Sequence, residues 1–160
     1  MGLELDLDKN NVTNNDKMKI MDKISKHYMN ENYMKFYDFD GIRFDAISNV
    51  IYWHGDTNRG ENRGAIELVK RLTTKIHGEH PSVMLIAEDS SAYSGVTKPV
   101  EYGGLGFDYK WDLGWMNDTL KYFKEDPVFR SNLSTHHKLT FSMMYFYSER
   151  FILPFSHDEV

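Results

Sequence analysis

Apolar residues recur at helical spacing in the stretch that follows residue 62. Intervals of three and four residues separate five of them, which predicts one buried face of an amphipathic helix: Ala65, Leu68, Val69, Leu72 and Ile76. Gly78 follows at the position where helices commonly end in a left-handed residue. The pattern therefore predicts a helix that ends near Gly78.

Three other segments show weaker helical patterns. Asp16 is placed to cap a helix that runs on towards Tyr37, and the segments 113–123 and 139–147 carry apolar stripes. Pro127 would close the second of these helices. The first fifteen residues are polar and rich in Asn, so we expect residues 1–15 to form a loose arm.

Short apolar runs alternate with these helices. Residues 42–47, 107–111 and 151–155 have the composition of strands, and residues 83–87 are apolar at every position. A fully apolar strand is typical of a parallel sheet that is covered on both faces. Strands that alternate with helices indicate an α/β fold built from βαβ units, with each unit taking about 30 residues or more. The chain is therefore long enough for about four or five units, whereas a complete (β/α)₈ barrel takes about 250 residues.

Composition narrows the functional classes. The chain has 160 residues, of which 41% are hydrophobic, and a formal charge of −5, which fits a packed protein rather than a disordered one. It has no Lys/Arg-rich run, so we expect no nucleic acid partner. No apolar stretch is long enough to span a bilayer, so we expect no membrane partner. The absence of cysteine fits a reducing compartment, and we expect a cytoplasmic protein.

Three of the predicted strands are each followed by an acidic residue: Asp45, Glu88 and Asp158. The carboxyl ends of parallel strands share one edge of a sheet, so these residues can converge although they are far apart in sequence. Neighbouring carboxylates separate their pKa values, which suits retaining glycoside chemistry with one nucleophile and one general acid. Aromatic residues of the intervening loops would suit the apolar faces of sugars: Tyr52, Trp53, Tyr93, Tyr102 and Trp111.

Each of these residues also has an ordinary structural interpretation. A single acid after a strand is usually a helix cap or an ion-pair partner, Arg43 would pair with such an acid, and aromatics are usually core. The His77–His80 segment has the wrong spacing for the H-E-x-x-H zinc motif, and residues 157–159 offer only a weak metal pattern. The glycines of residues 103–106 do not form a nucleotide-binding loop. We therefore expect no metal and no organic cofactor.

Three segments resemble signature motifs of the α-amylase superfamily, glycoside hydrolase family 13. They are residues 40–46 (DGIRFDA), 85–90 (LIAEDS) and 153–160 (LPFSHDEV), and their order and spacing also agree. Longer stretches around them resemble in particular the bacterial glycogen (1,4-α-glucan) branching enzymes, over about Tyr33 to Val160. The resemblance implies that residues 16–160 form part of a catalytic (β/α)₈ barrel, covering about strands 4 to 7 with their helices.

The resemblance also implies the role of each site residue. Asp45 would be the nucleophile, Glu88 the acid/base and Asp158 the stabiliser of the distorted sugar in the transition state. Arg43 would keep Asp45 ionised and oriented, and His157 would bind sugar hydroxyls. The substrate would be an α-1,4-glucan such as amylose or glycogen, with chains transferred to a 6-hydroxyl to form α-1,6 branches and no cofactor.

Other expectations follow from the departures from this pattern. The family's signature on the third barrel strand is not found before Asp45, and the eighth strand would lie beyond Val160. We therefore expect a fragment that is inactive alone, poorly soluble or dependent on the remainder of the barrel as a partner. The alternatives are another member of the superfamily, such as an amylase or a debranching enzyme, and a non-catalytic glucan-binding fragment.

Overall fold

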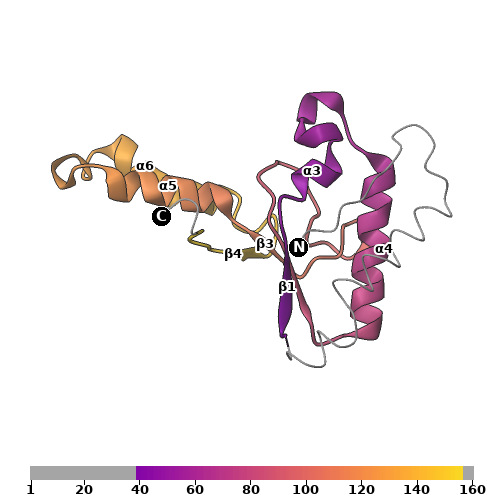
Figure 1. Cartoon of the computed structure of the whole chain (residues 1–160). Coiled ribbons are helices and arrows are strands. Elements are labelled where there is room, and N and C mark those ends of the chain that lie inside the picture. Colours follow the sequence, from indigo (N-terminus) through magenta and orange to yellow (C-terminus); the bar gives the residue numbers. More distant parts are fainter. Residues whose placement is uncertain (1–38, 157–160) are drawn as a thin grey trace, which may run out of the picture. The chain divides into compact units, whose positions relative to one another are not determined.

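The computed structural model of this chain describes residues 39–156. Within them lies a parallel sheet of four strands: β1 (Gly41–Phe44), β2 (Met84–Ala87), β3 (Tyr109–Trp111) and β4 (Phe151–Ile152). The strands lie side by side in sequence order, β1-β2-β3-β4 (Figure 1). The α/β class and the parallel sheet predicted from the sequence are confirmed.

The register of the sheet decides which side chains share a face. Arg43 is paired with Ile86, and Ile86 with Tyr109, while Ala87 is paired with Lys110. Paired residues of parallel strands point to the same side, and successive residues point to opposite sides. Arg43 and Trp111 therefore project from one face of the sheet, and Lys110 projects from the other.

Helix α4 (Arg63–Glu79) is the longest helix of the described residues, and it runs alongside the strands (Figure 1). The Asn62 side chain caps its first turn by accepting a hydrogen bond from the Ala65 amide. The predicted end near Gly78 is confirmed to within one residue, since α4 ends at Glu79 and His80 is the C-cap. The expectation that Gly78 itself is left-handed was wrong, because Gly78 stays helical. The buried residues of α4 are Ile66, Val69, Thr73 and Ile76. Val69 and Ile76 belong to the predicted stripe, whereas its other three members, Ala65, Leu68 and Leu72, are half-buried.

The expectation that β2 is buried on both faces was also wrong for the described residues. Val83, Leu85 and Ala87 are buried. The residues that follow each of them are only half-buried: Met84, Ile86 and Glu88. This alternation is the pattern of a strand with one covered face. The half-covered face is the one that carries Arg43 and Glu88, so side chains on it remain accessible.

No helix longer than one turn connects β2 to β3. Instead, residues 88–108 form a folded loop that contains the short 3₁₀ turn η3 (Val100–Tyr102). Three side chains of this loop are fully buried: Val96, Leu105 and Phe107. The hydroxyl of Thr73 on α4 donates to the Leu105 carbonyl over 2.7 Å. The loop thus contributes to the core in the place where a βαβ unit carries a helix.

Two helices separate β3 from β4: α5 (Leu113–Lys124) and α6 (Leu133–Thr140). The predicted helix over 113–123 is confirmed, with the Asp112 side chain as its N-cap. The prediction over 139–147 is only partly confirmed, since α6 gives way to the 3₁₀ helix η5 (Phe141–Met144) and then to turns. Four single-turn elements complete the described part: α3 (Ser48–Ile51), η1 (Trp53–Gly55), η2 (Thr57–Arg59) and η4 (Pro127–Phe129).

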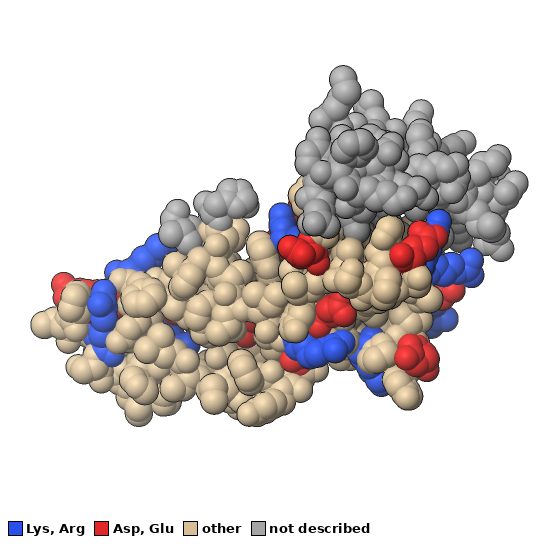
Figure 2. Space-filling view, turned by 90° about the horizontal axis from the view of Figure 1, so that it is seen from below, with Lys and Arg blue, Asp and Glu red and all other residues tan. Residues whose placement is uncertain are grey.

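Some expectations lie outside the described residues. These are the arm over 1–15, the helix begun at Asp16, and the two site residues His157 and Asp158. Within residues 39–156, no helix is both long enough and apolar enough to cross a membrane. Acidic and basic side chains are interspersed on the face shown in Figure 2.

Candidate active site

The carboxyl ends of β1 and β2 bring Asp45 and Glu88 to the same edge of the sheet. The main chains stay hydrogen-bonded just beyond the two strands: the Glu88 amide donates to the Phe44 carbonyl, and the Ile47 amide donates to the Glu88 carbonyl, each over 2.9 Å. These bonds fix the Cα positions of the two acids relative to each other. The predicted convergence of Asp45 and Glu88 is therefore found.

Arg43 links the two acids. Its Nη1 atom lies 2.9 Å from Oδ1 of Asp45 and also contacts Oε2 of Glu88. Asp45 directly follows the last residue of β1 and lies two residues after Arg43, so the two side chains can point to the same side. The Asp45 side chain is 76% exposed and that of Glu88 is 24% exposed. One cation between two carboxylates of unequal exposure is an arrangement that can hold a nucleophile and a proton donor side by side.

The indole ring of Trp111 supports the guanidinium from β3. The Cζ atom of Arg43 lies 4.7 Å from the ring centroid, within the range of a cation–π interaction. This contact reaches across β2, since Trp111 is on β3 and Arg43 is on β1. The ring thus limits the positions that the guanidinium can adopt beside Asp45 and Glu88.

The backbone turns sharply immediately after Asp45. Ala46 has a φ of 43°, in the left-handed region that residues with a Cβ seldom occupy. The turn sends the chain from β1 into α3, whose Ile51 is fully buried. Backbone strain of this kind is concentrated at functional sites, and here it lies next to the more exposed of the two acids.

The described residues include only part of the predicted site. Arg43, Asp45 and Glu88 come together, whereas Asp158 and His157 are not described. Of the loop aromatics that were predicted to suit sugar rings, Trp111 joins this site. Tyr52 and Tyr93 pack edge to face with 6.3 Å between their centroids, and burial, with Glu61 and Tyr52 nearby, raises the pKa of Tyr93.

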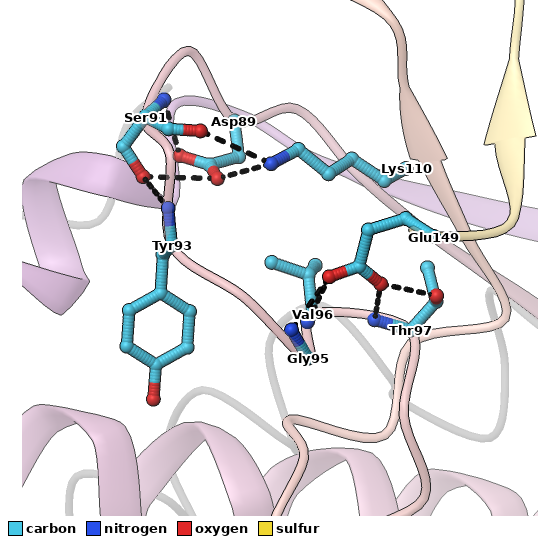
Figure 3. Close-up of polar contacts among 8 residues, drawn as sticks. All are labelled: Asp89, Ser91, Tyr93, Gly95, Val96, Thr97, Lys110 and Glu149. Carbon is cyan, nitrogen blue, oxygen red and sulfur yellow. Dashed lines mark hydrogen bonds and ion pairs between the residues drawn. The ribbon is translucent and has the colours of Figure 1, made fainter. Parts of the chain in front are cut away.

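A buried ion pair beside Glu88 was not predicted. Nζ of Lys110 lies 2.7 Å from Oδ2 of Asp89, and the two side chains are 8% and 0% exposed (Figure 3). The Ser91 amide and hydroxyl also donate to the Asp89 carboxylate, each over 3.0 Å. The available signal was a lysine between two aromatic residues in a predicted strand, because a lysine is seldom buried without a partner.

A second carboxylate in the same region is surrounded by backbone amides. The Glu149 side chain accepts hydrogen bonds from the amides of Gly95, Val96 and Thr97 over 2.6–2.9 Å, and from the Thr97 hydroxyl (Figure 3). These bonds fasten the loop after β2 to the segment that precedes β4. The sequence gives no pattern from which this partnership could be predicted.

Residues 39–156 contain no cluster of three or more His, Asp or Glu side chains that could hold a metal ion. His77, which the sequence places near a weak metal pattern, instead lies 3.0 Å from the Asp108 carboxylate. That carboxylate also accepts a hydrogen bond from the Leu85 amide of β2. His77 therefore takes part in joining α4 to the sheet.

Comparison with known proteins identifies several relatives. No protein-family profile matches the sequence. A protein of Fusobacterium nucleatum named 1,4-alpha-glucan branching enzyme is 55% identical over 128 residues, which are 80% of this chain and 20% of that protein. Proteins of the same name in Rhizobium etli and Bacillus subtilis are each 48% identical, over 80% and 79% of this chain and 19% and 20% of their own length.

The chain thus spans about one fifth of the length of the curated relatives that it matches. The matched part includes most of the chain, and the names of the relatives agree with the resemblance seen in the motifs. Four fifths of this chain is therefore homologous to one segment of the bacterial 1,4-alpha-glucan branching enzyme family.

Proposed function

We propose that this chain is part of a 1,4-α-glucan branching enzyme and carries its nucleophile and its acid/base. In this proposal β1 to β4 are the fourth to seventh strands of a (β/α)₈ barrel. The observation that carries it is the single guanidinium nitrogen of Arg43 that contacts both Asp45 and Glu88. Retaining glycosidases keep their two carboxyl groups about 5–5.5 Å apart, a spacing that one bridging nitrogen accommodates.

In the first half of the reaction, the Asp45 carboxylate attacks the anomeric carbon of an α-1,4-linked glucose. The bond from that carbon to the glycosidic oxygen breaks, and Glu88 donates its proton to the departing oxygen. The product is a glycosyl ester on Asp45 together with a shortened glucan. Asp45 suits attack because it is the more exposed of the two carboxylates.

In the second half, Glu88 acts as a base. It removes the proton from the 6-hydroxyl of another glucan, whose oxygen attacks the anomeric carbon and displaces Asp45. The configuration at that carbon is restored by the second inversion, and an α-1,6 branch results. Glu88 ends the cycle protonated and Asp45 ends it as a free carboxylate, so no cofactor is consumed.

Arg43 serves this cycle by its position. Its Nη1 atom donates a hydrogen bond to Oδ1 of Asp45 and so orients this carboxylate for attack. Its contact with Glu88 keeps the proton donor next to the same anomeric carbon. Asp158 would stabilise the distorted sugar ring and His157 would bind its hydroxyls, as the motif LPFSHDEV of residues 153–160 implies.

Trapping the glycosyl ester tests the assignment of the two acids. α-Maltosyl fluoride reacts by loss of fluoride, which needs no proton donor, so the Glu88→Gln variant can still form the ester on Asp45. Without a base the ester is not passed on to an acceptor, and peptide mass spectrometry should locate it on Asp45. The Asp45→Asn/Glu88→Gln variant should form no adduct, and Glu101→Gln should not accumulate one.

Because we expect the chain to depend on the remainder of the barrel, that remainder is added in this test and in the next. An adduct on another residue, or none in Glu88→Gln, would then contradict the proposed mechanism. The reaction class is tested separately by incubating the completed barrel with amylose. New α-1,6 linkages without released reducing ends indicate branching, whereas released reducing ends indicate hydrolysis. Glucan binding without turnover that Asp45→Asn leaves unchanged would favour a non-catalytic glucan-binding protein.

A further inference from the structure

We propose that the buried ion pair of Asp89 and Lys110 positions the Glu88 side chain against Arg43. Glu88 and Asp89 are consecutive residues that leave the end of β2, and their side chains lie on opposite sides of the chain. Asp89 is buried and Glu88 is half-buried on the face that carries Arg43. Holding Asp89 on one side therefore directs Glu88 to the other.

The backbone of Glu88 is already fixed on the β1 side. Its amide and carbonyl are bonded to Phe44 and Ile47, but no hydrogen bond of the described residues ties its peptide directly to β3. The Asp89 side chain supplies that tie, because Lys110 belongs to β3 and is paired in register with Ala87. Strands on both sides thus hold the two residues that end β2.

The ion pair also shapes the chain that leads away from Glu88. Nζ of Lys110 donates to the Ser91 carbonyl over 3.2 Å, and both oxygens of Asp89 accept from Ser91 (Figure 3). The Ser91 hydroxyl in turn accepts from the Tyr93 amide. The segment from Asp89 to Tyr93 is therefore folded around one carboxylate and one ammonium group.

Stability alone does not account for such a pair. The cost of removing water from two buried charges is comparable to their attraction, so apolar residues of similar volume often serve a fold as well. A buried pair can instead select one geometry among several. Here the pair selects the position of the Glu88 side chain, next to Asp89. The importance of that position for catalysis rests on the function proposed above for Glu88.

Arginine-selective NMR of the full chain tests this positioning without any need for activity. A guanidinium whose Nη1 atom is held by Asp45 and Glu88 should rotate slowly and give separate Nη signals, which the Arg43→Lys variant assigns by their loss. Lys110→Met should merge the Arg43 signals into one average, because Glu88 is released. Lys110→Arg, which keeps a cation for Asp89, should restore them.

Two further variants separate positioning from general damage. Asp89→Asn/Lys110→Met leaves no unpaired buried charge and should also merge the Arg43 signals. Glu149→Gln loosens the same loop at residues 95–97, away from Asp89, and Lys98→Met removes an exposed lysine of it, so both should leave the signals separate.

Separate Arg43 signals in folded Lys110→Met or in the folded double variant would overturn the proposal. Loss of the fold in both Lys110→Met and the double variant would also overturn it, since the pair would then stabilise the whole domain. Merged Arg43 signals in Glu149→Gln would overturn it as well. A failed proposed function gives a different result, namely no trapped ester in the Glu88→Gln variant whatever the state of the Arg43 signals.

Discussion

The guanidinium of Arg43 lies over the indole ring of Trp111, with 4.7 Å between Cζ and the ring centroid. The two residues are on β1 and β3, with β2 between them. Arg43 therefore receives its carboxylate partners from β1 and β2 and its aromatic partner from β3. Three strands fix the position of one cation, and their register controls the geometry of the candidate site.

A double-mutant cycle should measure this contact. We expect Arg43 and Trp111 to be coupled by about 0.5–1 kcal/mol of unfolding free energy, the usual size of a partly exposed cation–π pair. Arg43→Met and Trp111→Leu, made singly and together, give the coupling from urea unfolding. Trp115 packs on Phe155 instead, so an Arg43/Trp115 cycle should give a coupling near zero. Equal couplings in the two cycles would rule out a specific contact.

Two glycines should respond in opposite directions to the same substitution. A Cβ on Gly104 would lie 2.0 Å from the Lys98 carbonyl oxygen, so Gly104→Ala should destabilise the fold by at least about 1–3 kcal/mol. A Cβ on Gly78 would meet no atom within 4 Å. Because Gly78 lies inside α4, Gly78→Ala should stabilise by about 0.5–1 kcal/mol.

Thermal and urea unfolding of the two variants provide the measurement. A neutral Gly104→Ala would show that the loop can move away from Lys98, contrary to the packing seen here. A destabilising Gly78→Ala would show that Gly78 is left-handed, as the sequence pattern predicts.

The Glu149 carboxylate should be needed for the stability of the loop after β2. Glu149→Gln replaces one acceptor oxygen by an amide group that faces N–H donors, so hydrogen bonds to residues 95–97 are lost. We expect a loss of about 2 kcal/mol in unfolding free energy, since amide donors of a half-buried loop are left unpaired.

Glu67 offers a matched control for that substitution. It forms an exposed ion pair with Arg71 on α4, over 2.9 Å. Glu67→Gln should cost less than about 1 kcal/mol, as exposed pairs usually do. Urea unfolding measures the loss of unfolding free energy in each variant. Similar losses in Glu149→Gln and Glu67→Gln would show that water satisfies the amides of the loop once Glu149 is changed.

Tyr145 should make the stability depend on pH in the alkaline range. Burial, and then the hydrogen bond that its hydroxyl donates to Asp112, raise the pKa of Tyr145 well above its ordinary value of 10.0. The unfolded chain loses this proton near pH 10 while the folded chain keeps it, so the folded state binds more protons. The contribution is fully present below about pH 10 and is lost as the pH rises towards the folded pKa.

Urea unfolding at about pH 8 and about pH 11 tests this sign. The wild-type chain should lose more unfolding free energy between the two values than Tyr145→Phe, which has no proton to lose at that position. Equal losses in the two proteins would show that Tyr145 titrates in the folded state as it does in the unfolded state.

Local patterns predicted the elements of the sheet well. The apolar runs around residues 42–47, 83–87, 107–111 and 151–155 each contain a strand, because strand formation follows from a short buried run. The end of α4 was predicted to within one residue, but Gly78 is not left-handed, since it is exposed and has room to remain helical. The one-sided burial of β2 was also missed, because an apolar run does not reveal which face is covered.

The sequence likewise predicted only part of the candidate site. Asp45 and Glu88 could be brought together from the sequence, because parallel strands place their carboxyl ends at one edge. The partners of Lys110 and Glu149 could not, since each is joined to a loop residue by the fold of that loop rather than by strand register. The roles assigned to all five site residues stay predictions.

The loop over residues 88–108 fills space that a helix usually fills, with Val96, Leu105 and Phe107 wholly enclosed. Surface loops commonly accept insertions and deletions because their side chains face water. This one follows the residue that we assign to proton transfer and is clamped at Asp89 and at residues 95–97. A change in its length would shift buried side chains out of place, so we expect evolution to have varied its sequence far more freely than its number of residues.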